Sequence, residues 1–99
     1  MHVIVWAFEV KPSCEQQFER AYGPHGDWAR FFELGAGYLG TELLRAPGER
    51  RYLTIDRWQT REAYEAFRAA QLADYEKIDR GFERLTEREE QIGAFEQVP

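Results

Sequence analysis

Two acidic side chains, Glu42 and Asp56, are the clearest candidates for proton transfer in this sequence. They fall on neighbouring strands of a predicted hairpin, and we expect them to face the same side. Carboxylates placed side by side perturb each other's pKa, so one of them can hold or transfer a proton. The alternative is that one of them forms an ion pair with Arg57, Arg45 or Arg68.

A stripe of mostly aromatic residues follows the predicted hairpin. Its members recur at steps of three and four, which is typical of one face of a helix. They are Tyr64, Phe67, Gln71, Tyr75, Ile78, Phe82 and Leu85. Gln71 is the only amide, and the strand face that ends in Asp56 and Trp58 comes just before the stripe. This arrangement indicates either the wall of a small-molecule pocket or a core that contains one amide.

Histidine and cysteine are scarce. The sequence has two histidines and one cysteine, Cys14, so no intramolecular disulfide can form and a metal centre is not expected. His25 lies in a Gly-Pro-His-Gly loop, where a histidine is either solvated or close to a ligand.

Charge and hydropathy exclude several classes of protein. The net charge is −5, and Arg50-Arg51 is the only basic doublet, which argues against binding to nucleic acid or to an anionic membrane. No apolar run approaches the length of a membrane span. The apolar start, residues 1–10, lacks a basic region and continues into charged residues, so we interpret it as a strand and expect a cytoplasmic protein.

The order of predicted elements indicates the fold. Strand signals cover 3–10, 38–45, 51–58 and a short final segment, 91–95. A helix that Ser13 caps follows the first strand, with a second helical piece at 28–34. A long helix begins after Thr60, whose hydroxyl is a good N-cap. This order predicts one domain, residues 1–99, with the ferredoxin-like βαββαβ fold and an antiparallel four-stranded sheet.

Both faces of the first strand are apolar. Trp6 and Phe8 lie on one face, and Val3, Val5 and Ala7 lie on the other. Helices on one side of the sheet leave the second apolar face uncovered, and a second copy of the chain would cover it. We therefore expect a homodimer in which two sheets pack face to face.

Two segments of the sequence are GYLGTELLR (37–45) and YLTIDRW (52–58), and the second is followed by the helix start REAYEAF. Together with the order of elements, these segments resemble the antibiotic biosynthesis monooxygenase family. The resemblance extends over nearly the whole chain. It implies a dimeric α/β barrel with a cleft between the sheet and the helices of each subunit. Some members of this family oxygenate phenols or quinols without metal or flavin, because the deprotonated substrate itself reacts with dioxygen.

The resemblance also implies roles for residues at the cleft. An aromatic substrate would be held by rings of Trp6, Trp58, Tyr64, Phe67 and Tyr75, although Trp58 could equally be a core residue. Asp56 or His25 would take a proton, and Gln71 would orient a hydroxyl or carbonyl group. No cofactor is expected, and the alternative is a non-catalytic dimer that binds a small aromatic ligand or acts under stress.

Other family members degrade haem with a Trp, an Asn and a His. Trp58 matches the Trp. The Asn is not matched by Trp6, Ala7 or Phe8, and the His is not matched by the helix turn around Tyr75. Without an imidazole to bind iron, haem degradation is the less favoured function.

Overall fold

The computed structural model describes residues 1–99, and its order of elements confirms the predicted ferredoxin-like fold. The strands are β1 (His2–Val10), β2 (Tyr38–Arg45), β3 (Arg51–Trp58) and β4 (Thr86–Glu96). The helices are α1 (Glu15–Tyr22), α2 (Asp27–Phe32), α3 (Arg61–Ala70) and α4 (Leu72–Phe82), and a 3-10 turn, η1 (Glu83–Leu85), follows α4. All strands pair antiparallel in one sheet, in the order β2-β3-β1-β4.

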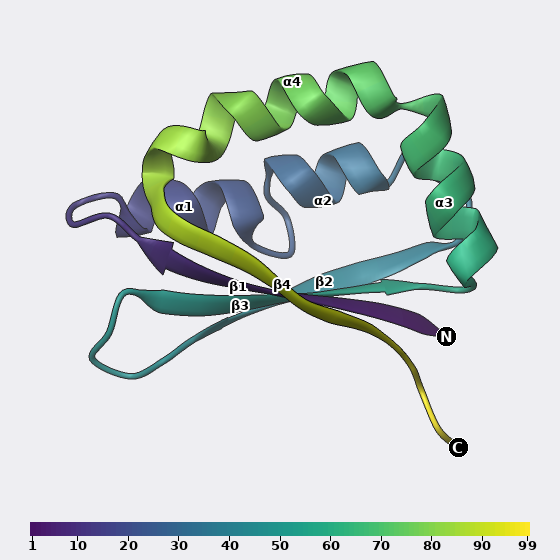
Figure 1. Cartoon of the computed structure of the whole chain (residues 1–99), viewed down its shortest axis with the longest axis horizontal. Helices are drawn as coiled ribbons and strands as arrows, with labels where there is room; N and C mark the ends of the chain where they lie inside the picture. The colour runs from purple at the N-terminus through teal and green to yellow at the C-terminus, as the bar shows by residue number, and fades with distance from the viewer.

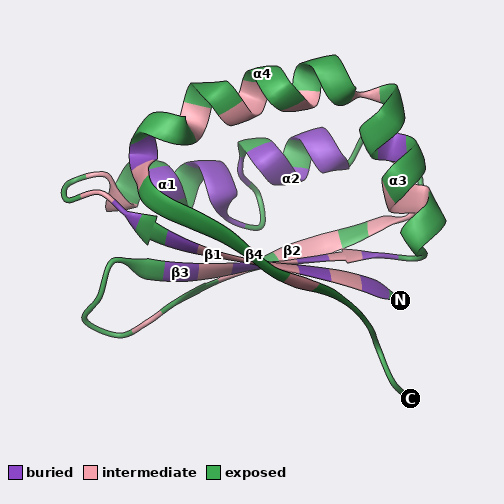
Figure 2. Cartoon of the chain, in the orientation of Figure 1, coloured by how far each residue is buried: buried purple, intermediate pink, exposed green.

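All the helices lie on one side of the sheet. Figure 1 shows α1 and α2 next to the sheet, α4 above them, and α3 rising from the end of β3 to reach α4. Figure 2 shows buried residues on α1 and α2, whereas α4 is exposed or half-buried along its length. None of the helices combines the length and the apolar character that crossing a membrane requires.

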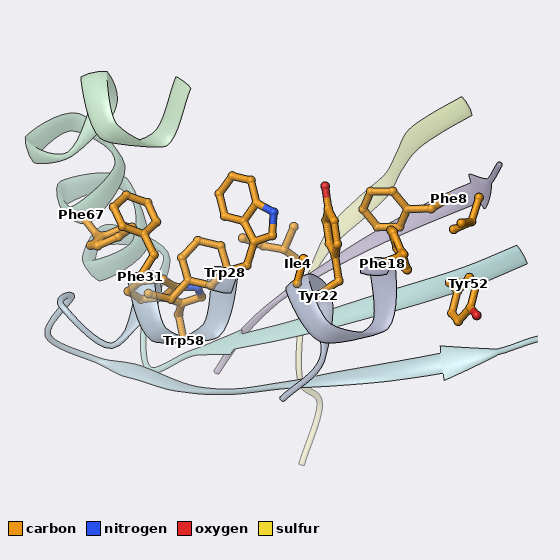
Figure 3. Packing of buried hydrophobic residues seen from close by; sticks show 12 residues of the cluster. Ile4, Phe8, Phe18, Tyr22, Trp28, Phe31, Tyr52, Trp58 and Phe67 are labelled. Atoms are coloured by element: carbon orange, nitrogen blue, oxygen red, sulfur yellow. The ribbon is translucent and has the colours of Figure 1, made fainter. Parts of the chain in front are cut away.

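The core is a single layer of aromatic rings between the helices and the sheet. Figure 3 shows Phe8, Phe18 and Tyr52 at one end of this layer and Trp58 and Phe67 at the other. Phe18 and Tyr22 stack with their ring centroids 4.2 Å apart. Packed rings of this kind contribute stabilisation beyond the apolar area that they bury.

The predicted long helix is broken in two at Gln71. Thr60 caps the first part as predicted, because its hydroxyl accepts a hydrogen bond from Ala63 N at 3.0 Å. Gln71 then leaves helical geometry, with φ −112° and ψ 22°, and α4 begins at Leu72. The stripe therefore does not continue along one helix, and its members on α3 and α4 face different surroundings.

Two smaller expectations were wrong. Ser13 does not cap α1: it has a positive φ of 70°, and the helix starts at Glu15 after Cys14, with no side-chain cap. The last strand is longer than predicted, because it begins at Thr86 and not at Gln91. The charged segment 87–90 is extended because it pairs with β1.

The second face of the sheet is bare. Val3, Val5 and Ala7 on β1 are only half-buried there, and Ile92 and Phe95 on β4 are about half exposed. A shallow groove of about 490 Å³ runs over this face between β2 and β4. The apolar surface for which we expected a partner is therefore present.

Candidate functional site

A partly open cavity of about 150 Å³ lies between the sheet and the helices. Every strand and every α-helix contributes at least one residue to it. Its aromatic side chains are Trp6, Phe8, Tyr22, Trp28, Phe32 and Tyr75. Its polar and charged side chains are Thr41, Thr54, Asp56, Arg68, Asp79 and Glu89. Aromatic walls with a few convergent polar groups are typical of small-molecule sites.

Asp56 is the buried acid of this cavity. Its residue is 8% exposed, and its side chain forms no ion pair. Burial raises the pKa of the Asp56 carboxyl to about 6, and the hydrogen bond from Thr41 acts in the opposite direction. A carboxyl with a pKa near neutrality is ionised in most molecules at pH 7, and it can still accept a proton easily.

A β-bulge brings Tyr38 to the face of the sheet that carries Thr41 and Asp56. The pairing of β2 with β3 shifts between Tyr38 and Gly40, and Gly40 has a φ of +136°, which a glycine adopts without strain. The shift turns Tyr38 and Thr41 to the same face of the sheet. The Thr41 hydroxyl then donates a hydrogen bond to Asp56 Oδ1 at 2.6 Å.

The register of the hairpin overturns the predicted carboxylate pair. Thr41, not Glu42, lies opposite Asp56 in the two strands. Glu42 points to the bare face and forms an ion pair with Arg57, one of the ion pairs that the sequence left open. The bulge does not cause this, because it lies before Glu42 and the pairing from Gly40 to Arg45 is regular.

Charged side chains surround the mouth of the cavity. Burial raises the pKa of both Asp79 and Glu89, and the charge of Asp79 raises that of Glu89 further. Arg68 is the only cationic side chain of the lining. Its guanidinium carbon lies 5.0 Å from the centroid of the Tyr75 ring, and it forms no ion pair with a protein carboxylate.

The cavity contains three of the predicted site residues: Trp6, Asp56 and Tyr75. Trp6 lies on β1 and Tyr75 on α4, so the sheet and the outer helix supply opposite walls. Burial raises the pKa of the Tyr75 phenol well above its usual range, so this hydroxyl stays protonated and can donate a hydrogen bond. Their roles toward a substrate remain predictions.

The other predicted residues lie elsewhere. Trp58 is 0% exposed and Phe67 is 6% exposed, and both belong to the aromatic core. Tyr64 packs on Trp58, with 5.5 Å between their ring centroids. Gln71 sits at the junction of α3 and α4, outside the cavity lining, and His25 is exposed in the loop between α1 and α2.

The sequence alone did not indicate Thr41, Trp28 or Arg68 as cavity residues. Trp28 comes from α2, which packs between the sheet and α4, with 5.1 Å between the ring centroids of Trp28 and Tyr75. No local pattern brings residues from α2, α3 and β2 to one place. Their convergence depends on the break at Gln71 and on the bulge at Gly40.

The family model for antibiotic biosynthesis monooxygenases matches residues 1–74. This chain belongs to that family. No curated protein matches the sequence. The matched region contains Asp56, Thr41 and Arg68, whereas Tyr75, Asp79 and Glu89 lie beyond its end.

Solved structures of the same fold include three informative neighbours. A mutant form of SnoaB, a cofactor-independent oxygenase from Streptomyces nogalater, has 22% identity and a TM-score of 0.77, covering 99% of this chain and 93% of that one. A putative antibiotic biosynthesis monooxygenase from Nitrosomonas europaea has 15% identity and a TM-score of 0.75, covering 100% of both chains. The haem degrader MhuD from Mycobacterium tuberculosis, with two haems bound in its active site, has 27% identity and a TM-score of 0.65, covering 100% of this chain and 97% of that one.

The residues of the cavity do not fit haem. Its lining contains no histidine, cysteine or methionine to bind iron. Its phenols, Tyr22 and Tyr75, have pKa values that burial raises, which opposes their conversion to iron-binding phenolates. This chain shares the fold of MhuD, but its cavity lacks the donor chemistry that haem requires.

Proposed function

We propose that this chain is a cofactor-independent monooxygenase-like protein that deprotonates a quinol in the cavity and thereby makes it reactive toward dioxygen. One observation carries the proposal: Asp56, with a pKa of about 6, lines a cavity whose walls include six aromatic side chains. A general base works best when its pKa is near the working pH. The proposal is consistent with the similarity to SnoaB, a cofactor-independent oxygenase.

The cavity residues would divide the work as follows. The rings of Trp6, Trp28 and Tyr75 hold the flat substrate and exclude water from it. Asp56 takes the proton of a substrate hydroxyl, and the electron pair stays on the substrate oxygen. Arg68, free of any ion pair, stabilises the resulting anion. Dioxygen then bonds to a ring carbon of this electron-rich anion, and cleavage of the O–O bond leaves one oxygen on the ring as a carbonyl and releases the other as hydroxide.

The volume of the cavity limits the substrate. Engineered apolar cavities of about 150 Å³ bind benzene, whereas drug-sized ligands occupy pockets of about 300–1,000 Å³. The cavity of this chain is about 150 Å³. A quinol with one ring therefore fits as the structure stands, and a polycyclic polyketide requires α4 to move away from the sheet.

Oxygen uptake tests the proposal. We expect the protein to accelerate oxygen consumption by hydroquinone above the rate without protein, and Asp56→Asn to lower this acceleration at least about 100-fold, which is typical for loss of a general base. Glu42→Gln is the matched control, because it removes an exposed carboxylate from the other face of the same hairpin. Equal activity of Asp56→Asn and the wild type would refute the proposal.

One observation favours the alternative, a non-catalytic protein that binds a small aromatic ligand. The lining holds three carboxylates, Asp56, Asp79 and Glu89, against the single cation Arg68. An excess of negative charge opposes the formation of a substrate anion. Saturable binding of phenol by calorimetry, without any oxygen uptake on a panel of one-ring and multi-ring quinols, would favour this alternative.

We further propose that two copies of the chain pair through the bare face of the sheet. Val5 lies in the middle of this face, opposite Ile55 on β3 and Gly93 on β4. A buried charge without a partner is costly, so Val5→Asp should convert the dimer to monomers, whereas Ala69→Asp on exposed α3 should not. Light scattering that shows only monomers of the wild type at micromolar concentration would contradict this proposal.

A further inference from the structure

Asp56 needs a route by which it can lose a proton after it has taken one from the substrate. The residue is 8% exposed, and its accessible side faces the cavity, which a bound ring fills. A line of hydroxyl groups starts at Asp56 with Thr41, which also lines the cavity, and ends at Tyr38, which lies outside the lining. Asp56 Oδ1 is 2.6 Å from Thr41 Oγ1, and Thr41 Oγ1 is 2.5 Å from the Tyr38 hydroxyl.

The direction of each hydrogen bond follows from the number of hydrogens. Ionised Asp56 can only accept, so the single hydrogen of the Thr41 hydroxyl points to it. Tyr38 must then donate to Thr41 Oγ1. Thr41 therefore accepts from Tyr38 and donates to Asp56, so the two hydroxyls and the carboxylate form one continuous chain of hydrogen bonds.

The line runs from the interior of the sheet to its edge. Asp56 lies on β3, which is flanked by β1 and β2, whereas Tyr38 and Thr41 lie on β2, the edge strand. Tyr38 is only partly buried. The bulge between Tyr38 and Gly40 creates the line, since regular alternation would place Tyr38 and Thr41 on opposite faces.

We propose that Thr41 and Tyr38 form a proton path from Asp56 to solvent at the edge of the sheet; this inference rests on the proposed role of Asp56 as the base. After Asp56 has taken the substrate proton, both hydroxyls rotate so that Asp56 donates to Thr41, Thr41 to Tyr38 and Tyr38 to water. The proton on Asp56 then passes to Thr41 Oγ1, the proton of Thr41 passes to the Tyr38 oxygen, and the proton of Tyr38 passes to water, where it neutralises the hydroxide released from dioxygen. The hydrogens that Thr41 and Tyr38 receive point back toward Asp56, so the resting hydrogen bonds return and Asp56 is again an ionised acceptor.

Rapid mixing with hydroquinone and dioxygen tests the path. Asp56 is ionised in the resting protein, so the first turnover of Tyr38→Phe should proceed at the wild-type rate. Later turnovers wait for Asp56 to lose its proton, and we expect their rate to fall at least about tenfold. The signature is a burst of one product per site, which a purely structural role of Tyr38 does not produce.

Two controls isolate the hydroxyl groups. Tyr52→Phe removes another tyrosine hydroxyl from the same face of the sheet, one that donates to Glu19 instead of Thr41, and it should give no burst. Thr41→Ser keeps the path, whereas Thr41→Val should behave like Tyr38→Phe. Wild-type steady-state turnover in both Tyr38→Phe and Thr41→Val, or equal slowing of first and later turnovers, would overturn the path.

The outcome for Asp56→Asn separates the two proposals. If that variant is as active as the wild type, the proposed base is wrong and the path falls with it. If it is inactive while Tyr38→Phe shows no burst, only the path is wrong.

A titration of the Asp56 carboxyl carbon by NMR adds a readout without turnover: Thr41→Val should raise its midpoint, because the Thr41 hydrogen bond lowers the pKa of Asp56. An unchanged midpoint would contradict the hydrogen bond on which the path depends.

Discussion

Two aromatic regions lie side by side on the helix-bearing face of the sheet, and only one of them is open. Around Trp58, the centroids of the neighbouring rings lie 5.3–5.9 Å from the centroid of the Trp58 ring, and Trp58 is 0% exposed. Around Trp6, rings from α2 and α4 surround the cavity instead of closing it. Both regions are equally aromatic in sequence, so residue type alone does not separate a core from a pocket.

The difference lies in the side chains opposite the rings. Beside Trp58 the backbone comes close, since a Cβ added at Gly35 would lie 2.8 Å from the indole. Next to Trp6 the sheet carries short polar side chains, Thr54 and Asp56, which leave space under α2 and α4. Small and acidic residues on a sheet face, rather than large aromatic ones, are therefore the better indicator of a cavity.

The largest expected effect is on stability, and it distinguishes the closed region around Trp58 from the open region around Trp6. Trp58→Ala should lower the free energy of unfolding by about 3–5 kcal/mol, because it opens a hole in a packed core. Trp6→Ala should cost less than about 2 kcal/mol, because Trp6 already borders a cavity, and it should weaken phenol binding instead. Urea unfolding and calorimetry measure the two quantities. Equal destabilisation by both variants would remove the distinction between the regions.

Asp56→Asn should have the next largest effect on stability, and it should be stabilising. The folded carboxyl has a pKa of about 6 against an ordinary value of 3.8, so between these values the folded state binds more protons than the unfolded state. Stability is therefore lost as the pH rises through this range, and above it ionised Asp56 costs about 1–3 kcal/mol.

The amide removes this charge and still accepts the Thr41 hydrogen bond. Melting curves should show that Asp56→Asn is more stable than the wild type at pH 7 and that the gain disappears below about pH 3, where the carboxyl is neutral in both states. A variant that is less stable than the wild type at pH 7 would mean that Asp56 is a structural brace.

Gln71→Leu should have the smallest effect. From the helical stripe, Gln71 was expected to face the cleft, but it lies at the α3–α4 junction and its side chain forms no hydrogen bond. We expect a change below about 0.5 kcal/mol in stability, as is usual for positions without a special contact, and no change in phenol affinity. A marked loss of phenol binding would show that the cavity extends to this junction.

The fold was predictable because its signals are local and repeated. The apolar run of β1, the alternation in β3 and the Thr60 cap each specify an element, and the order of elements specifies the topology. The site was predictable only in part, with Trp6, Asp56 and Tyr75 placed on the cavity. Gln71 failed because helical periodicity does not reveal where a helix breaks, and Glu42 failed because alternation within each strand does not reveal the register between the two strands.

The most direct test of the account is the pH dependence of kcat/KM for hydroquinone oxidation. If Asp56 is the base, kcat/KM should rise with pH through an inflection at about 6 and then level off, because the free protein is active when Asp56 is ionised. Glu42→Gln should leave this inflection in place. A profile that is flat between about pH 5 and pH 7, or an inflection that persists in Asp56→Asn, would contradict the central role of Asp56.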